Sequence, residues 1–334
     1  MSGSRARAEL IGDRGEAAVC EEFFRSRPFL DAEGVTHTLR IEVAAAAGEP
    51  AELLAPLVVR SIGDGPERDA ISPYGYPGLT PPRRVAGLSR HPEQSGNSAG
   101  GLEALEPAEI DWGETGLVSV FLRHRLGESP LSGTTERNVV QIADPALPPK
   151  SRPSDRRQVR RNLEAGYEVQ LVPGTETGAE QRTAFLDLYE QTMRRTGAAP
   201  HYFFGAAYFD RILEADRTWL ALALAPGGDP AAASIAAVSD GYLHYYLSGS
   251  ADSHLRDSPM KNIVARLVEH STELGLPLNL GGGIARGDAL EEFKRGFANR
   301  QIPWHTSELI CDPEKYNLLS AGHAPGAFFP AYRS

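Results

Sequence analysis

The stretch Pro277–Phe297, PLNLGGGIARGDALEEFKRGF, constrains the fold of this chain more than any other. A short apolar strand is expected at Leu276–Leu280, where Asn279 interrupts the apolar run, and Gly281–Gly283 stop it. After a flexible loop, Asp288 is placed to cap a helix. In an α/β fold, ligands usually lie just beyond a strand end of this kind. The stretch therefore predicts a candidate ligand site.

The helix expected at residues 288–298 has one apolar face and one lysine beside it. Leu290, Phe293 and Phe297 recur at i, i+3 and i+7, which is the spacing of a buried helical stripe. Lys294 follows Leu290 by one turn, so we expect it beside this stripe and not opposite it. The chain would then hold an ammonium close to an apolar wall. The alternative is an ordinary amphipathic helix with a surface lysine.

The glycines and the Phe-Lys pair of this stretch resemble the end of the second domain in Fem-type peptidoglycan branching transferases. Those enzymes move an amino acid from aminoacyl-tRNA onto an amine. The matching residues are Gly281, Gly282, Gly283, Asp288, Leu290, Phe293, Lys294 and Phe297. The resemblance implies that Lys294 supports the transfer. Asp288 is a second candidate catalytic residue, and Gly282, Gly283 and Phe293 are candidate substrate-binding residues.

Length and composition exclude several classes of protein. A chain of 334 residues is long for one core, so two domains are expected. The two cysteines, Cys20 and Cys311, form neither a disulfide framework nor a zinc pattern, and no metal is expected. We expect a cytoplasmic protein, because we find no signal peptide and no bilayer-spanning apolar run. A net charge of −10 excludes a strongly basic nucleic-acid binder, but not a local basic patch.

The first half of the chain has weaker patterns. A helix is predicted at Glu16–Arg25, with its apolar residues turned inward. Short strands are predicted at Thr36–Val43, Leu57–Ile62, Leu117–Leu122 and Asn138–Ile142. A polar, glycine-rich loop is expected at residues 91–101.

Two features of the first half also resemble Fem-type enzymes. Ile71–Gly78, ISPYGYPG, is predicted to be an irregular loop because it holds two prolines and two glycines. It presents Tyr74 and Tyr76 to an acceptor, as a similar loop does in the family, or else it is a packed turn. Arg123 stands in an F-x-R pattern of the family, but the usual His-Pro is replaced here by a histidine at 124 followed by arginine. The candidate acceptor-binding residues are Tyr74, Tyr76 and Arg123.

The second half of the chain is more regular. It predicts, in order, strand Tyr167–Val172, helices Ala179–Arg195 and Gly205–Ala215, strands Trp219–Ala225, Ala232–Ser239 and Tyr242–Ser248, helix Pro259–Leu274, strand Leu276–Leu280, helix Asp288–Ala298 and strand Trp304–Ile310. Asp240-Gly241 is a strong hairpin signal. This order of elements resembles the GNAT acyltransferase fold, and Fem-type enzymes contain two such domains.

The resemblance implies an α/β (α+β) protein with two GNAT-like domains, each a mixed central sheet with flanking helices. A proline-rich linker is expected at Asp144–Pro153. Residues 1–148 would form a degenerate N-terminal copy, on which the tail at 312–334 packs. Residues 149–311 would form the C-terminal copy.

A basic helix is expected directly after the linker. Lys150–Asn162 holds six basic residues against one acid, and Ser154 or Asp155 can cap the helix. The helix is either a solvated surface or a phosphate contact for tRNA or another phosphorylated ligand. A similar R-x-x-R-R helix occurs at this point in the Fem-type family. With two residues from a later turn, the candidate phosphate-binding residues are Arg157, Arg160, Arg161, Arg256 and Lys261.

The turn at Ser248–Met260 bears on the identity of the donor. GNAT enzymes generally hold the CoA pyrophosphate on the bare amides of a glycine-rich turn at this point. Here those glycines are absent, and Pro259 removes an amide donor. Asp257 or Ser258 is expected at the helix cap, where a carboxylate would repel phosphate. The sequence therefore disfavours a conventional CoA site.

The chemistry asked of such a site is modest. An aminoacyl ester is already activated, so catalysis needs positioning and a positive group at the developing oxyanion, for which Lys294 is the candidate. The candidate general bases are Asp288, Glu291, Glu292 and His244. Tyr245 and Tyr246 alternate faces of a strand, so one of them, Tyr245 by preference, can face the ligand. His201 and His244 lack a metal-ligand pattern, and a packed or surface position is expected for each.

Three functions stay open. The leading one is an aminoacyl-tRNA-dependent aminoacyltransferase, without a cofactor and as a monomer, that forms an amide bond with an amine. The acceptor would be a peptidoglycan precursor, a natural-product peptide or an amino sugar. The second is an acyl-CoA-dependent N-acyltransferase, and the third is a non-catalytic binding or immunity protein with a GNAT-like body.

Overall fold

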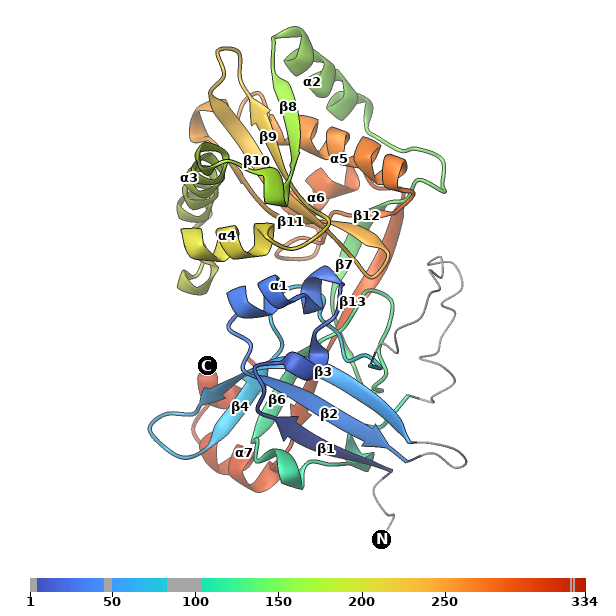
Figure 1. Cartoon of the computed structure of the whole chain (residues 1–334), viewed down its shortest axis with the longest axis vertical. Coiled ribbons are helices and arrows are strands. Elements are labelled where there is room, and N and C mark those ends of the chain that lie inside the picture. The colour runs from blue at the N-terminus through green and yellow to red at the C-terminus, as the bar shows by residue number, and fades with distance from the viewer. Residues whose placement is uncertain (1–4, 45–49, 83–103, 325, 327) are drawn as a thin grey trace. The chain divides into compact units, whose positions relative to one another are not determined.

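The computed structural model describes residues 5–44, 50–82, 104–324, 326 and 328–334, so the loop predicted at 91–101 lies outside the described residues. The chain divides into two compact units, whose elements are labelled in Figure 1. The first unit comprises Met1–Cys20, Glu33–Arg137 and Pro303–Ser334. The second unit comprises Glu21–Ala32 and Asn138–Ile302.

The first unit is built on a mixed sheet with the strand order β5-β1-β2-β3-β4-β6-β13. Its strands are β1 (Ala6–Ile11), β2 (His37–Val43), β3 (Ala51–Ser61), β4 (Arg68–Ile71), β5 (Ile110–Asp111), β6 (Ser119–Arg123) and the part of β13 (Arg300–Ile310) that follows Ile302. β4 and β6 pair in parallel, whereas β6 and β13 pair antiparallel. Leu39 and Ile41 on β2 and Leu53 and Leu57 on β3 point toward one face and are fully buried. Leu54 is buried as well, so β3 is covered on both faces at this point.

Residues after β13 belong to the first unit. They form helix α7 (Pro313–Leu319) and a final 3₁₀ turn. The guanidinium of Arg333 donates to both carboxylate oxygens of Asp69, over 2.5 and 3.0 Å. Asp69 is fully buried and also accepts a hydrogen bond from Arg60. The tail therefore neutralises a carboxylate inside the first unit.

The helix predicted at Glu16–Arg25 is wrong. The structure has two separate 3₁₀ turns, Glu16–Ala18 and Phe23–Arg25, and then helix α1 (Arg27–Ala32). Phe23 and Phe24 are adjacent in sequence and both are fully buried. The backbone is extended at Val19 and at Glu22, which separates the two turns and interrupts the helix.

The second unit is built on a sheet with the strand order β7-β12-β11-β10-β9-β8. The strands are the part of β7 (Thr135–Ala143) that follows Arg137, β8 (Glu168–Pro173), β9 (Thr218–Leu224), β10 (Pro230–Ser239), β11 (Tyr242–Ser250) and β12 (Leu278–Asn279). β8, β9, β10 and β11 pair antiparallel, and β11 pairs with β12 in parallel. The predicted order of elements in this half of the chain is confirmed.

Helices cover both faces of this sheet. They are α2 (Pro153–Glu164), α3 (Ala179–Thr196), α4 (Ala206–Leu213), α5 (Met260–Leu274) and α6 (Ala289–Arg295). α3 and α4 lie on one face, with α1 packed against α4, while α5 lies on the other with α2 beside it (Figure 1). Ile263, Val264 and Leu267 of α5 are fully buried against the sheet.

The β10–β11 hairpin turns at Asp240 and Gly241, as predicted. Both residues have positive φ angles, 50° and 80°, which is typical of the two-residue turns that match strand twist. The pairing register shifts at Ile235 and Ala236, so that Tyr246 has no partner on β10. Such an irregularity bends a strand and redirects its side chains.

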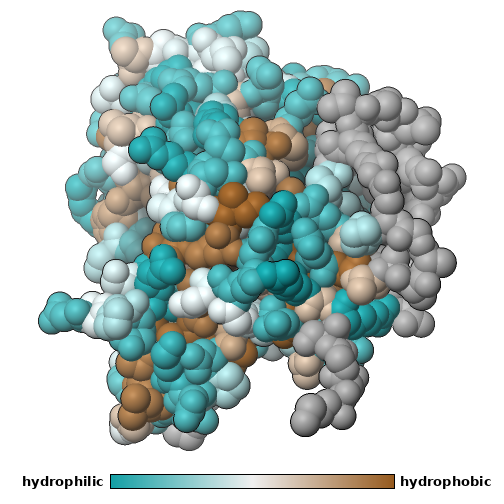
Figure 2. Space-filling model, turned by 60° about the horizontal axis from the view of Figure 1, so that its bottom comes forward, coloured by the Kyte–Doolittle hydropathy of each residue, from teal (hydrophilic) through white to brown (hydrophobic). Residues whose placement is uncertain are grey.

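Exposed apolar side chains are scattered over the described residues. Ile284 is 88% exposed and Leu318 is 76% exposed. Figure 2 shows apolar residues interspersed with polar ones on the face that it draws. None of the helices in the described ranges combines the length and apolarity that are needed to cross a bilayer.

Candidate active site

Lys294 lies inside the second unit, near the end of α6. Only 8% of the residue is exposed, and its Nζ donates a hydrogen bond of 2.7 Å to the carbonyl oxygen of Gly282. The same Nζ lies 6.0 Å from the centre of the Tyr245 ring. Burial lowers the pKa of Lys294 to about 8. An ammonium carries three donors, and within the described residues one of them has an acceptor, so two are left for a ligand.

The surroundings of Lys294 differ from the predicted apolar stripe. Leu290 is 39% exposed, Phe293 is half-buried and Phe297 is buried. The prediction of a buried Leu290 is wrong. α6 ends at Arg295, so Phe297 lies beyond the helix. The helical spacing therefore does not extend over all three apolar residues. Lys294 is more deeply buried than Leu290 and Phe293, and a backbone carbonyl oxygen accepts a hydrogen bond from its Nζ.

The glycine loop is shaped by close contacts with its neighbours. Gly281 adopts a left-handed φ of 75°, which favours glycine. A Cβ at Gly282 would lie 2.4 Å from the amide atoms of Asn138. Asn138 Nδ2 also donates to the carbonyl oxygen of Gly283 over 2.7 Å. Within the described residues, the N–H groups of Gly282 and Gly283 donate to no protein acceptor, so they too are left for a ligand.

Asp288 caps α6, as predicted, and it also holds the loop. Its Oδ1 accepts from the backbone N–H of Glu291 over 2.7 Å. Its Oδ2 accepts from the N–H groups of Ile284 and Ala285, over 2.7 and 2.9 Å. These backbone donors lower the pKa of Asp288. Both oxygens are thus engaged, which suits a structural clamp better than the predicted catalytic role.

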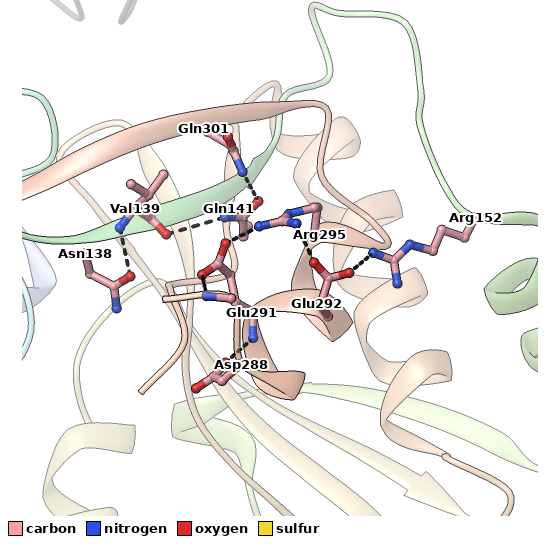
Figure 3. A network of polar contacts seen from close by, with 10 residues as sticks. Asn138, Val139, Gln141, Arg152, Asp288, Glu291, Glu292, Arg295 and Gln301 are labelled. Atoms are coloured by element: carbon pink, nitrogen blue, oxygen red, sulfur yellow. Dashed lines mark hydrogen bonds and ion pairs between the residues drawn. The ribbon is translucent and has the colours of Figure 1, made fainter. Parts of the chain in front are cut away.

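The two glutamates of α6 are also engaged (Figure 3). Glu291 accepts from the N–H of Gly287 over 2.7 Å and pairs with Arg295, and these contacts lower its pKa. Glu292 bridges Arg295 and Arg152, the latter over 2.6 Å. Each carboxylate is neutralised by an arginine, so neither is poised as the general base that the sequence allowed.

The candidate histidines do not face Lys294 or a metal. His244 is buried on the opposite face of β11 from Tyr245, with its ring edge-on to Phe24 at 4.9 Å. Burial lowers its pKa to about 4. His201 lies exposed on a 3₁₀ turn before α4. No group of three metal-binding side chains occurs among the residues described. His244 is a packed residue and His201 is a surface residue.

The basic helix is α2, and its arginines are solvent-exposed. Arg157, Arg160 and Arg161 are exposed, and none of them makes an ion pair with a described carboxylate. Asp155 does not cap the helix. It is buried and pairs with Lys261 over 2.9 Å. Lys261, predicted to meet phosphate, is therefore already neutralised.

The turn before α5 is filled by its own side chains. The Tyr167 hydroxyl donates to the Asp257 carboxylate over 2.8 Å. Asn162 Nδ2 donates to the Asp257 carbonyl oxygen over 2.7 Å, which fastens α2 to this turn. The predicted cap is wrong, because Pro259 stands at the N-cap without a side-chain hydrogen bond. Arg256 is exposed beside the turn.

The predicted acceptor residues belong to the first unit. The loop at 71–78 is irregular, as predicted, with Tyr74 exposed and Tyr76 edge-on to Trp304 at 5.5 Å. Arg123 donates to the carbonyl oxygen of Ser72, and its guanidinium lies 5.2 Å from the centre of the Phe121 ring. The structure brings Lys294, Tyr245, Gly282 and Asp288 together within the second unit.

Comparison with known proteins bears on the fold that carries this site. Residues 149–295 match the family model of the acetyltransferase (GNAT) domain. This part of the chain is a GNAT-type domain. A search of curated proteins found no match. The fold class that the sequence predicted is confirmed.

Three solved structures extend the likeness to most of the chain. FemX is 11% identical with a TM-score of 0.54, over 84% of this chain and 89% of FemX. L-PGS from Bacillus licheniformis is 12% identical with a TM-score of 0.50, over 84% and 82%. The C-terminal domain of a putative lysylphosphatidylglycerol synthetase from Agrobacterium fabrum is 12% identical with a TM-score of 0.52, over 92% of each chain. At these identities the likeness shows the fold, and the predicted resemblance to Fem-type proteins is confirmed at that level.

Proposed function

We propose that this protein is an aminoacyltransferase that uses aminoacyl-tRNA and forms an amide bond with an acceptor amine. The observation that carries the proposal is Lys294, a buried ammonium with donors left for a ligand, set beside a glycine loop with unpaired amides. The GNAT-type domain supports acyl transfer as the reaction class. One neighbour in fold is named for a product, lysylphosphatidylglycerol, in which an amino acid has been attached to another molecule.

The reaction is an exchange of an ester for an amide. The neutral acceptor amine attacks the carbonyl carbon of the aminoacyl ester, and a C–N bond forms. The carbonyl electron pair moves to oxygen, where the ammonium of Lys294 stabilises the charge. The intermediate then collapses, the bond to the ribose oxygen breaks, and the proton lost by the amine ends on that oxygen. Atoms and charge balance without a further reactant.

The described carboxylates near Lys294 do not supply a strong base. Asp288 and Glu291 are held by backbone N–H groups, and Glu292 lies between two arginines. An activated ester attacked by a neutral amine needs positioning more than a strong base. The site therefore suits a donor that is already activated, as an aminoacyl ester is.

The turn before α5 favours an aminoacyl-tRNA over acyl-CoA. A GNAT-type phosphate site needs free backbone amides at this helix start. Here the N–H groups of Lys261 and Asn262 donate to the carbonyl oxygens of Ser258 and Pro259. The carboxylate of Asp257 stands in the same turn and would repel a pyrophosphate.

The exposed arginines of α2 supply a surface for the polyanionic part of the donor. Arg157, Arg160 and Arg161 are free of carboxylate partners among the described residues, unlike Lys261. Arginines without a carboxylate partner can pair with phosphates of the tRNA and release the counterions bound there. For the acceptor, we propose a peptide or amino-sugar amine, of a peptidoglycan precursor or a natural product.

The match to the acetyltransferase domain favours a second candidate function, acyl-CoA-dependent N-acyltransfer. A donor assay separates the two. The purified protein is incubated with a panel of amines and either charged tRNA or acetyl-CoA, and the products are identified by mass spectrometry. We expect amide products from charged tRNA alone. Acetylated products in the absence of tRNA would replace the first proposal with the second.

The role of Lys294 is tested by single-turnover kinetics. Lys294→Met keeps most of the side-chain stem and removes the charge, so the rate should fall on the order of 10²–10³ while donor binding is retained. Lys315→Met, at an exposed position on α7, is the matched control and should react at the wild-type rate. Transfer by Lys294→Met at the control rate would remove Lys294 from the mechanism.

A further inference from the structure

Asn279 is a buried amide in an apolar strand. It lies on β12 between Leu278 and Leu280, and 2% of it is exposed. Its Oδ1 accepts from the backbone N–H of Gly281 over 2.8 Å, and its Nδ2 lies 3.0 Å from Nδ1 of His244. A buried amide is costly unless its groups are bonded, and here both ends are used.

The hydrogen bonds fix the direction of this pair. The N–H of Gly281 can only donate, so the atom that accepts from it is the amide oxygen of Asn279. The amide nitrogen then donates to Nδ1 of His244, which must be unprotonated. The Nε2–H of His244 is left to donate to the carbonyl oxygen of Ser239, over 3.1 Å. Burial keeps the histidine neutral, with a pKa of about 4.

The hydrogen bonds from His244 through Asn279 to Gly281, called the relay below, end at the backbone that holds Lys294. The carbonyl oxygen of Gly281 accepts from the N–H of Gln141 over 3.0 Å, so Gly281 is bonded on both sides of its Cα. Its φ of 75° lies in the left-handed region, which favours glycine. The carbonyl oxygen of the next residue, Gly282, accepts a hydrogen bond from the Lys294 ammonium. Replacing Asn279 would remove the hydrogen bond to the N–H of Gly281 and loosen the backbone directly before Gly282.

We propose that Asn279, oriented by His244, is a positioning residue that sets the Gly281–Gly282 backbone against the ammonium of Lys294. The importance of this placement for transfer rests on the proposed function, whereas the placement itself does not. A residue that acts through another should change the environment of Lys294 and the rate of the chemical step, and leave donor binding unchanged.

The lysine content of the chain allows a direct measurement. The sequence has four lysines, Lys150, Lys261, Lys294 and Lys315, so lysine labelled with ¹³C at Cε gives four signals. The signal that Lys294→Met removes is that of Lys294. Its pH titration then reports the environment of the ammonium without any assay of activity.

In Asn279→Ala, the Lys294 signal should move and its pKa should rise by about 0.5 or more, because water enters a loosened loop. The kcat should fall at least about tenfold, with the KM for the donor unchanged. Asn279→Asp restores an acceptor for the Gly281 N–H and can pair with a protonated His244. This variant should return the signal toward its wild-type position.

Asn262→Ala is the matched control. Asn262, on α5, is 3% exposed and accepts a hydrogen bond from Asn162. Its replacement should therefore lower the free energy of unfolding about as much as the replacement of Asn279. It should leave the Lys294 signal in place. If Asn279→Ala does not fold, His244→Leu breaks the relay one residue earlier and should move the same signal.

The outcomes separate the two proposals. A Lys294 signal and titration that are unchanged in Asn279→Ala and in His244→Leu would overturn the positioning role, whatever the activity. A signal that moves, in a protein whose wild type transfers no amino acid from tRNA, would support the positioning role and reject the proposed function.

Discussion

The amide of Asn138 occupies the space that a side chain at Gly282 would need, since a Cβ there would lie 2.4 Å from the Asn138 amide atoms. The same amide donates to the carbonyl oxygen of Gly283. Asn138 and Gly282, which are 144 positions apart, are thus fitted to each other near Lys294. Figure 3 shows Asn138 beside the polar contacts of α6.

Gly282→Ala should therefore destabilise the protein, by about 1–3 kcal/mol, because the added methyl displaces Asn138 and breaks its bond to Gly283. Asn138→Ala removes the obstacle. The double variant should lose less stability than the sum of the single variants, with a coupling of about 0.5–3 kcal/mol. Urea denaturation of the four proteins measures this, and strict additivity would contradict the fitted contact.

The stability of the protein should depend on pH through Lys294. Its pKa is about 8 in the folded protein, against an ordinary 10.5. Between these values the unfolded chain binds more protons, so the free energy of unfolding should rise as pH increases from 8 to 10.5. Relative to Lys294→Met, the wild type should gain about 2–3 kcal/mol across this window. Urea denaturation of both proteins at pH 7.5 and 10 gives the difference, and parallel pH profiles would show that Lys294 is not buried as described.

The rate advantage of the wild type over Lys294→Met should shrink above pH 8. The proposed role needs the ammonium, which loses its proton as pH rises through about 8. Ionisation of the acceptor amine affects both proteins alike, so it cancels in the ratio of their rates. A ratio that stays constant to pH 10 would mean that the charge of Lys294 does not act on the reaction.

Replacing Arg157, Arg160 and Arg161 by alanine should weaken tRNA binding and flatten its salt dependence. Each phosphate contact that is lost removes a released counterion, so the slope of log K against log salt should decrease by roughly 2–3. Filter binding at several salt concentrations measures the slope. Melting temperature should change little, because the three side chains are exposed.

A control for the basic helix is a triple alanine variant at Arg7, Arg194 and Arg211. These arginines are also exposed, and each has a glutamate partner. The control changes net charge by the same amount and should keep the wild-type slope. An equal loss of slope in both variants would mean that net charge, and not α2, governs binding.

Arg25→Ala should be among the most destabilising single substitutions in the second unit. Arg25 is buried and donates to both oxygens of Asp240, over 2.6 and 3.2 Å. Removing one partner of a buried pair costs about 3–5 kcal/mol, because the other charge stays desolvated. Arg182→Ala, which breaks the more exposed pair with Asp210, should cost less than about 1 kcal/mol. Similar losses in the two variants would contradict this ranking.

Local signals in the sequence were sufficient for much of the second unit. The positive-φ pair Asp240-Gly241 and the cap at Asp288 each depend on residues within a few positions of one another, and both predictions are confirmed. The prediction at Glu16–Arg25 failed because Phe23 and Phe24 are fixed by contacts with Tyr246 and His244, far along the chain. Helical periodicity carries no information about such contacts.

The Lys294 site also depends on contacts between residues that are distant in the sequence, which local patterns do not reveal. Lys294 was identified from its motif, but its contact with Gly282 and its burial depend on the loop conformation. Asn138 has no sequence signal, because its partner glycine is distant in the chain. Asn279 did have one, since a polar residue interrupts an apolar strand, but its partner His244 becomes apparent only when β11 and β12 pair.

The segment Glu21–Ala32 has a consequence for how the chain matures. During synthesis, Arg25 can pair with Asp240 only after 215 more residues have been made. Asp69 can pair with Arg333 only after 264 more. At 5–20 residues per second, a ribosome needs roughly 10–40 s to supply Asp240 after Arg25. During that interval Phe23, Phe24 and Phe29 lack Tyr246 of β11, which all three rings contact in the folded protein. Neither unit can close early in synthesis, so the two halves of this protein reach their native state almost together.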